Sequence, residues 1–328
     1  MRALIHDISR RRIITQSLIT LSGMALLSCS GGNHSSQPVP VVRPLGTPDQ
    51  GGIGFLVFKN ESKIAVYNFA SLVNIEFSPE KNIPSEIGIG VSRSGLIAVA
   101  DKGENPDGGF FISLFNSDAS LKNRIQIKRA NSSLVSSIVF SPDEKYFAFT
   151  VKEIVFANSR KRWNRTLVLE LASIQVITQF DNYEDPVWIG LTGELVLRRS
   201  NSGFLNGFSS KFADQGQFAN IEVKPSSGSY DVSPDGQFVV WDADKVIYAY
   251  DRATQLQWAA VEDRLNAIYA PLFAPNGRLL ALHGKKATSY CPHIVPFVVS
   301  ATVNLESDIH ALTNNTLQAT QGRMGWYV

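Results

Sequence analysis

The chain has little cysteine and no hydrophobic run long enough to cross a bilayer as a helix. Cys29 and Cys291 are the two cysteines among 328 residues, so a disulfide framework does not hold this fold together. The apolar stretch Ile13–Leu27 has 15 residues, fewer than the ~20 that a transmembrane helix needs. Residues 51–328 are numerous enough to bury a large hydrophobic core, which makes disulfides unnecessary.

The sequence also lacks the motifs of common catalytic and haem sites. Gly90–Ser94 misses the closing glycine of a Gly-x-Ser-x-Gly nucleophile elbow, and the absence of Cys-x-x-Cys-His excludes a haem attached in that way. Two segments resemble metal sites, namely Cys291–His293 near His283, and Asp101–Gly109 with its carboxylates. The first matches no standard ligand spacing and reads as a loop, and the second is foremost a turn sequence. We therefore expect neither a metal nor another cofactor.

The charge balance argues against nucleic-acid binding. The formal net charge is +2, but four arginines lie in residues 1–28. Without those residues Lys+Arg falls from 31 to 27 and Asp+Glu from 29 to 28, which gives a net charge of −1. A near-neutral body lacks the basic surface that a nucleic-acid-binding domain needs.

A turn signal recurs along the chain at nearly constant spacing. The clearest copies are Ser141–Glu144, Ser233–Gly236 and Ala274–Gly277, and weaker ones begin at Thr47, Ser92 and Gly190. Proline presets the backbone angle of the second turn position, aspartate bonds to its own backbone, and glycine tolerates positive φ. A short apolar run follows the turn, for example Leu279–Leu282. Such a run is too short for a helix and predicts a buried strand.

The spacing of the turns predicts the fold. From Ser92 the motif starts step by 49, 49, 43 and 41 residues, an average of 45.5, which is typical of one four-stranded propeller blade. Thr47 and the degenerate turn at Thr320 lie 273 residues apart, which is six periods. We therefore predict an all-β fold, a six-bladed β-propeller of four-stranded antiparallel blades. Seven blades are the alternative.

Two units show the expected strands. In the clearest unit they are Ser229–Val232, Gln237–Trp241, Val246–Asp251 and Leu256–Val261. In the last unit they are Tyr269–Phe273, Leu279–Leu282, Phe297–Val303 and Ile309–Leu312. Because an open array would leave an unpaired strand edge, a terminal strand must complete blade one. Val39–Val42 and Gly325–Val328 are the candidates, and we expect the second, which is more apolar and aromatic, to close the ring.

The repeated turn resembles the WD40-like repeats of TolB-type propellers, in which Ser-Pro-Asp-Gly joins the first and second strands of a blade. The copies at Ser141 and Ser233 match this pattern best, and the resemblance covers about residues 47–328. It implies a TolB-like propeller architecture and says little about function. TolB carries an additional N-terminal α/β domain that has no counterpart in this sequence.

The N-terminus predicts export and a lipid anchor. Arginines 10–12 precede the short apolar core, which ends in Leu26-Leu27-Ser28-Cys29, a segment similar to the lipobox of bacterial lipoproteins. We expect a signal peptide at residues 1–28, lipidation of Cys29, a flexible tether over 29–50, and the propeller over 51–328. Lipidation of Cys29 would leave no cysteine pair for a disulfide. The arginines also resemble a twin-arginine signal, with Sec-dependent export as the alternative. Ser30 favours the outer membrane if the source is Gram-negative, with the propeller on the periplasmic side.

Cations recur in the segments that join the second and third strands, which propeller topology places on one side of the ring. The candidate partner-binding residues there are Lys59, Lys102, Lys152, Arg162, Trp163, Arg198, Arg199, Lys245, Lys285 and Lys286. Long loops are expected nearby at Phe156–Arg165, Gly203–Lys211 and Ala287–Pro296. The turns on the opposite side carry Asp49, Asp143, Glu144, Glu194 and Asp235. This separation of charge predicts attraction of an acidic partner; alternatively, solvated loops and turns carry these residues for local reasons.

The leading functional hypothesis is a non-enzymatic module, monomeric and anchored to the cell envelope, that binds a protein or peptide partner at its loop-rich side. The first alternative is a propeller enzyme of the lactonase, hydrolase or lyase type, with a metal in the central channel. The second is an envelope assembly scaffold. Convergence of several His, Asp, Glu or Asn side chains in the channel would favour catalysis. The inner strands offer Asp185 and Asp231 but no histidine, so we favour binding.

Overall fold

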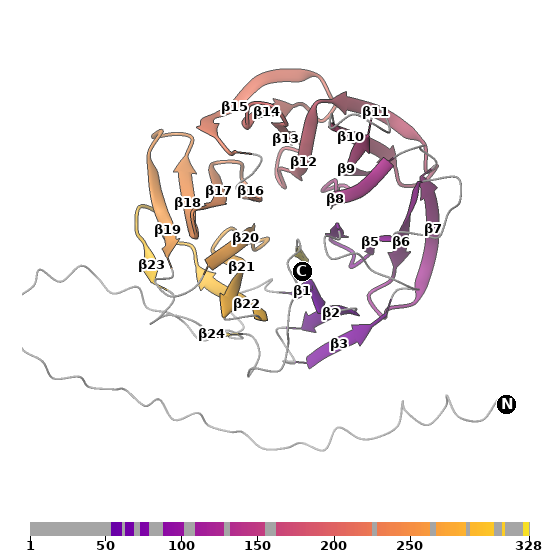
Figure 1. Ribbon diagram of the computed structural model, residues 1–328, viewed down its shortest axis with the longest axis horizontal. Helices are drawn as coiled ribbons and strands as arrows, with labels where there is room; N and C mark the ends of the chain where they lie inside the picture. Colours follow the sequence, from indigo (N-terminus) through magenta and orange to yellow (C-terminus); the bar gives the residue numbers. More distant parts are fainter. Residues whose placement is uncertain are drawn as a thin grey trace, which may run out of the picture. The chain divides into compact units, whose positions relative to one another are not determined.

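A computed structural model of the chain describes residues 54–60, 63–68, 73–78, 88–101, 109–127, 132–154, 162–224, 228–262, 267–286, 289–304, 310–311 and 324–327. These residues form strands, turns and loops and contain no helix. The strands make six sheets arranged in a ring (Figure 1). The predicted six-bladed β-propeller is confirmed, and the alternative of seven blades is not.

Each sheet has four antiparallel strands that follow one another from the channel outward, and one sheet has a fifth strand. Blade two is β4 (Ile89–Val91), β5 (Ile97–Asp101), β6 (Phe110–Phe115) and β7 (Leu121–Ile127). Blade three is β8 (Ser132–Phe140), β9 (Tyr146–Ile154), β10 (Arg162–Glu170) and β11 (Val176–Asp181). Blade four is β12 (Tyr183–Trp188), β13 (Leu195–Arg199), β14 (Phe204–Phe208) and β15 (Asp214–Glu222). Blade five is β16 (Tyr230–Val232), β17 (Phe238–Ala243), β18 (Val246–Asp251), β19 (Gln257–Glu262) and β23 (Val303–Asn304).

Blade one closes the ring with strands from both ends of the described chain. From the channel outward it consists of β25 (Gly325–Tyr327), β1 (Phe55–Asn60), β2 (Lys63–Asn68) and β3 (Val73–Phe77). β25 pairs antiparallel with β1, and Trp326 lies opposite Leu56. The choice of Gly325–Val328 as the closing segment is therefore confirmed. Residues 1–53, which include the predicted signal peptide, Cys29 and the tether, lie outside the described residues.

Blade six differs from its prediction in the third strand. It consists of β20 (Ala267–Phe273), β21 (Leu279–Lys286), β22 (Ser289–Pro296) and β24 (His310–Ala311). The predicted third strand, Phe297–Val303, is wrong, and the predicted loop Ala287–Pro296 supplies that strand instead. Pro292 and Pro296 made this segment look like a loop. Within the described residues β24 pairs with His293 and Ile294, so neither proline has to donate to it there.

Two other predicted loops are also partly strand. Arg162–Arg165 belong to β10, and β14 occupies most of the predicted loop Gly203–Lys211. Asn206-Gly207 reads as a turn signal, yet it lies within β14. The pairing of β14 with β15 shifts register next to Gly207, so the glycine serves an irregularity in the sheet rather than a turn. Neither correction changes the number or order of the blades.

Val303–Asn304 leave blade six and join blade five. β23 pairs parallel with β19, where Val261 lies opposite Val303. Val303 is buried in the cluster between these blades, and the Thr302 hydroxyl donates to the Ala259 carbonyl at 2.7 Å. The connection within blade six therefore covers the outer edge of blade five.

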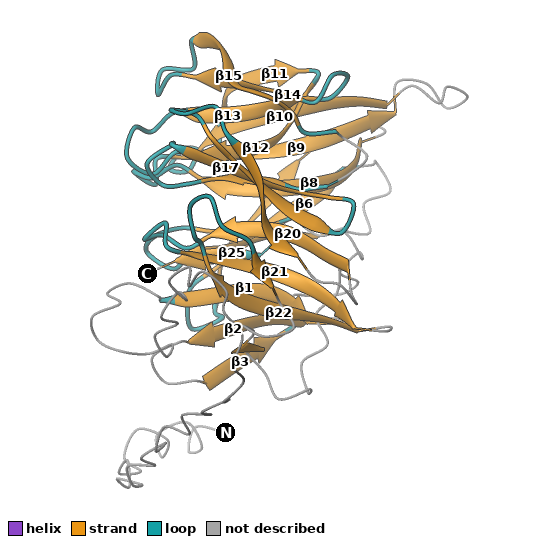
Figure 2. Cartoon of the chain, turned by 90° about the vertical axis from the view of Figure 1, so that its left-hand side faces the viewer, coloured by secondary structure: helices purple, strands orange, loops and turns teal. Residues whose placement is uncertain are grey.

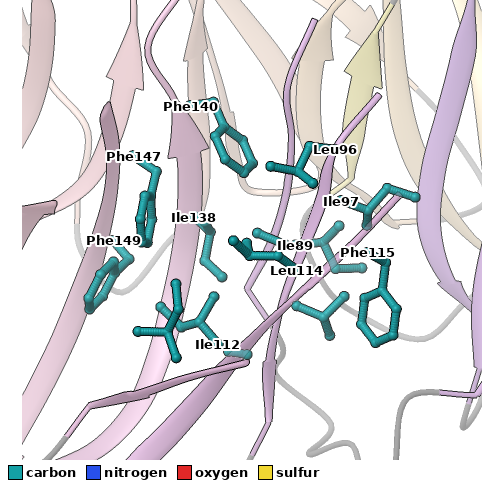
Figure 3. Packing of buried hydrophobic residues seen from close by; sticks show 14 of the residues in the cluster. Ile89, Leu96, Ile97, Ile112, Leu114, Phe115, Ile138, Phe140, Phe147 and Phe149 are labelled. Carbon is teal, nitrogen blue, oxygen red and sulfur yellow. The ribbon is translucent and has the colours of Figure 1, made fainter. Parts of the chain in front are cut away.

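Apolar residues on the facing sheets fill the space between blades. Figure 3 shows the cluster around blades two and three, in which Ile112 of blade two faces Ile138 and Phe149 of blade three. All three of these side chains are at most 1% exposed. Gly90 permits close contact between the two inner strands, because a Cβ there would lie 2.5 Å from the Ile138 carbonyl oxygen. Burial of this kind is the main stabilising contribution in a ring of sheets.

The two sides of the ring carry different connections. We call the side with the turns between first and second strands the turn face, and the side with the connections between second and third strands the loop face. Figure 2 shows the ring from its edge; the turn face is on the left, where many of the teal turns lie.

Candidate functional site: an aromatic pocket at the turn face

A cavity of about 420 Å³ opens in the central channel at the turn face. Every blade contributes a residue at or next to the turn end of its inner strand, and these six residues are Val91, Phe140, Trp188, Val232, Phe273 and Trp326. Four of the six are aromatic. Because they lie near the same end of every inner strand, the radial fold brings together residues that are far apart in the sequence. We call this cavity the aromatic pocket.

The rim of the aromatic pocket is built by the repeated turns. In the turn at Ser233, the hydroxyl donates to Asp235 at 2.5 Å and accepts from the Phe238 N–H at 2.9 Å. Gly236 has a φ of +75°, which an L side chain rarely adopts. The turn at Ser141 repeats both hydroxyl contacts, to Asp143 and from Tyr146. These local bonds fix the turns, so the rim is preorganised.

The rim carries apolar groups and charges of both signs. Pro142, Pro234 and Pro275 line the pocket, and Leu191, in the turn of blade four, is 76% exposed. The turns also carry Asp143, Glu144, Glu194 and Asp235. Although partial burial opposes it, hydrogen bonds from Ser141 and Lys145 and the charge of Lys145 lower the pKa of Asp143. That carboxylate therefore stays ionised.

Two charged side chains line the aromatic pocket. Asp231, on β16, accepts a hydrogen bond from the Phe273 N–H at 2.7 Å, which joins blades five and six. Asp231 also lines a narrower cavity of about 50 Å³ deeper in the channel, so it lies where the two cavities adjoin. Arg93 is exposed, and its Nη2 lies 3.4 Å from the Gly190 carbonyl oxygen of blade four.

The residues predicted to bind a partner lie at the other face, and only some of them are exposed. Arg199 and Lys245 are exposed, whereas Lys59 and Arg198 are each 4% exposed. Burial lowers the pKa of Lys59. Lys152 is half-buried on β9, and the side chains of Arg162, Trp163, Lys285 and Lys286 and the whole of Lys102 lie outside the described residues. Lys59 and Arg198, which were expected at the surface of this face, are therefore buried.

Arg198 is buried because it neutralises two carboxylates on the neighbouring inner strand. Its Nη2 lies 3.2 Å from Glu184 Oε1 and bonds to Asp185 Oδ2, and its Nη1 donates to the Gly228 carbonyl at 2.7 Å. Glu184 and Asp185 are 4% and 8% exposed. Burial, together with the charge of Asp185, raises the pKa of Glu184 despite Arg198 and Lys152. This cluster connects blades four and five at the loop face.

The raised pKa of Glu184 predicts a stability that depends on pH. The folded state binds this proton more tightly than the unfolded state, so the contribution is complete below about pH 4.5 and is lost as pH rises through the folded pKa. Glu184→Gln should remove this loss, so its free energy of unfolding at pH 7 should be higher than that of the wild type. Urea unfolding of both proteins between pH 4 and pH 8 measures the effect. Parallel pH profiles for the two proteins would contradict it.

The metal candidates from the sequence lie only partly within the described residues. No three or more His, Cys, Asp or Glu side chains in this part of the chain lie close enough to hold a metal ion. Cys291 and His293 lie on β22 rather than in a loop, and Glu104, Asn105 and Asp107 of the calcium candidate lie outside the described residues. The described segments also contain no helix long and apolar enough to span a membrane.

The aromatic pocket was not predicted from the sequence, although a signal for it is present. The cations of the loop face were the predicted partner-binding residues, and Asp231 was noted as an inner-strand candidate. The residue just before the turn motif is aromatic at Phe140 and Phe273, and Trp188 lies two residues before Gly190. Aligning the repeats at these positions predicts an aromatic lining on the turn face.

No family model matches the sequence, and no curated protein matches it either. Solved structures do match, in 859 chains. A crystal structure of a protein of unknown function from Bacteroides caccae aligns with a TM-score of 0.52 at 9% identity, over 83% of this chain and 97% of that chain. A chain of the mitotic checkpoint complex has a TM-score of 0.46 at 13% identity, over 82% of this chain and 71% of that chain. At such identities the likeness concerns the fold alone.

Proposed function

We propose that this chain is a propeller-based binding module that captures a segment of a protein partner in the aromatic pocket. The observation that carries the proposal is the pocket itself, about 420 Å³ in volume and lined by aromatic side chains from four blades. Concave sites with mostly apolar linings and a few polar groups are typical of ligand binding. Prolines and Leu191 extend the apolar surface to the rim, where a partner chain would continue beyond the pocket.

The proposal shifts the binding site from the loop face to the turn face. Lys59 and Arg198 are buried and Arg198 is engaged by two carboxylates, so neither presents its charge to a partner. A role for the exposed cations Arg199 and Lys245 in attracting an acidic partner remains a separate prediction. The metal-dependent enzyme of the first alternative finds no specific support in the pocket lining.

We further propose that the module is exported and lipid-anchored. Support comes from the sequence alone, from the arginines, the short apolar core and Leu26-Leu27-Ser28-Cys29. Acylation of Cys29 would tether the propeller outside the cytoplasm, where a partner in the envelope is within reach. We also propose that the propeller is TolB-like. The support for this again comes from the sequence alone, from its Ser-Pro-Asp-Gly turns.

A photo-crosslinking experiment tests the proposed site. A benzophenone amino acid at position 191, which is exposed at the rim, should crosslink a partner in envelope extracts. The same probe at Ile177, which is 47% exposed on the outer strand β11, should not. Leu191→Glu, placed on the full chain, should reduce capture of that partner at least about 10-fold, because it puts a charge into the apolar contact. Equal crosslinking at both positions, or undiminished capture by the Glu variant, would reject the pocket as the site.

A further inference from the structure

The lining of the aromatic pocket combines aromatic residues with a carboxylate. The walls carry Phe140, Trp188, Phe273 and Trp326, and Asp231 lies where the pocket meets the deeper cavity. Aromatic faces attract cations through the ring quadrupole. An ionised carboxylate only accepts hydrogen bonds, and it accepts them most strongly from a charged donor.

The position of Asp231 is fixed by the fold. It lies on β16 between Tyr230, which is 1% exposed, and Val232, which is 4% exposed. The Phe273 N–H holds one carboxylate oxygen, Oδ2. The carboxylate therefore has little freedom to rotate out of the channel. A ligand that passes the aromatic walls reaches an acceptor that is already oriented.

The rim carries charges of both signs. Its acidic residues Asp143, Glu144, Glu194 and Asp235 belong to the turns of blades three, four and five. Its cations include Arg93, which lines the pocket, Lys145, which pairs with Asp143 at 3.3 Å, and Arg252, which donates to the Gly236 carbonyl. The charge preference of the pocket therefore depends on Asp231, which lies inside it.

We propose that the aromatic pocket selects a lysine or arginine side chain presented by an extended segment of the partner. The apolar stem of that side chain would contact the aromatic walls, and its charged end would donate to Asp231. An acidic or phosphorylated side chain would meet the like charge of Asp231 inside the pocket, and a purely apolar side chain would cover that carboxylate with hydrocarbon, which is costly. This inference rests on the proposed function and adds the chemistry of the ligand to it.

Peptide selection tests the inference on the full chain. A library of random heptapeptides displayed on phage is selected against the wild-type protein, against Asp231→Asn and against Leu191→Glu. Asparagine keeps an acceptor for the Phe273 N–H, so the variant should fold, which circular dichroism and thermal melting verify. The wild type should enrich peptides with Lys or Arg flanked by apolar residues. Asp231→Asn should bind a selected peptide about 10- to 100-fold more weakly, as expected for loss of a charge-assisted hydrogen bond.

A second measurement does not depend on a variant. Replacing the selected Lys by norleucine keeps the apolar stem and removes the charge, and it should weaken binding to the wild type by a similar factor. Peptides that are enriched, depend on Leu191 and yet show no preference for Lys or Arg would overturn this inference and leave the proposed function standing. The same holds for a norleucine peptide that binds as tightly as its Lys parent. Enrichment of no peptide by the wild type would count against both proposals.

Discussion

Removal of residues 325–328 should lower the free energy of unfolding by at least about 4 kcal/mol. The deletion takes away β25, whose Trp326 is 8% exposed, and loss of a buried aromatic side chain alone costs about 3–5 kcal/mol. It also leaves β1 without its inner neighbour. Since 1 kcal/mol shifts the melting temperature of a domain near this size by ~2–4 °C, melting should occur about 10 °C lower.

Trp326→Phe is the matched control for the deletion. It retains an aromatic ring and the backbone pairing of β25 with β1, so it should cost about 1 kcal/mol. Thermal melting and light scattering distinguish the two proteins, because the unpaired β1 edge should also promote association of the truncated chain. A truncated protein that melts within a few degrees of the full chain would show that closure by β25 contributes little.

The second large effect is expected at the buried charge cluster. Arg198→Met should destabilise the protein by about 3–5 kcal/mol, because it leaves the carboxylates of Glu184 and Asp185 buried without their principal counter-charge. The Gly228 carbonyl loses its 2.7 Å donor as well. Urea unfolding at pH 7 measures the change.

Arg199 provides a neighbouring control for Arg198. It is exposed, and its guanidinium lies 5.7 Å from the ring centroid of Tyr183, so Arg199→Met should change stability by no more than about 0.5 kcal/mol. Adding Glu184→Gln and Asp185→Asn to Arg198→Met should restore much of the lost stability, since the remaining buried groups are then neutral. Equal effects of the two arginine substitutions would contradict the role assigned to Arg198.

The repeats predicted the architecture because they are local signals with a fixed period. Turns such as Ser233–Gly236 hold their shape through bonds within a few residues, so they can be read without knowledge of the rest of the fold. Closure of the ring by Gly325–Val328 could be predicted because this segment is apolar and aromatic. The third strand of blade six was missed because Pro292 and Pro296 argue locally against a strand. Tertiary pairing with β21 overrides that preference.

The candidate site was less predictable because it depends on contacts between distant segments. The burial of Arg198 follows from its pairing with Glu184, which lies directly across from it on the adjacent strand. Without that register, a cation at a strand end looks like a surface residue. Phe140, Trp188, Phe273 and Trp326 lie in four different blades. They form one lining only after the ring has closed.

The strand β23 has a consequence for how the molecule comes apart. Val303–Asn304 belong in sequence to blade six but hydrogen-bond to blade five, so the two sheets are joined by this connection as well as by their shared core. Amide hydrogens of these two sheets should therefore exchange with solvent as one cooperative unit. Attempts to divide the ring into two complementary fragments should place the cut elsewhere, for example at Asn182, between blades three and four.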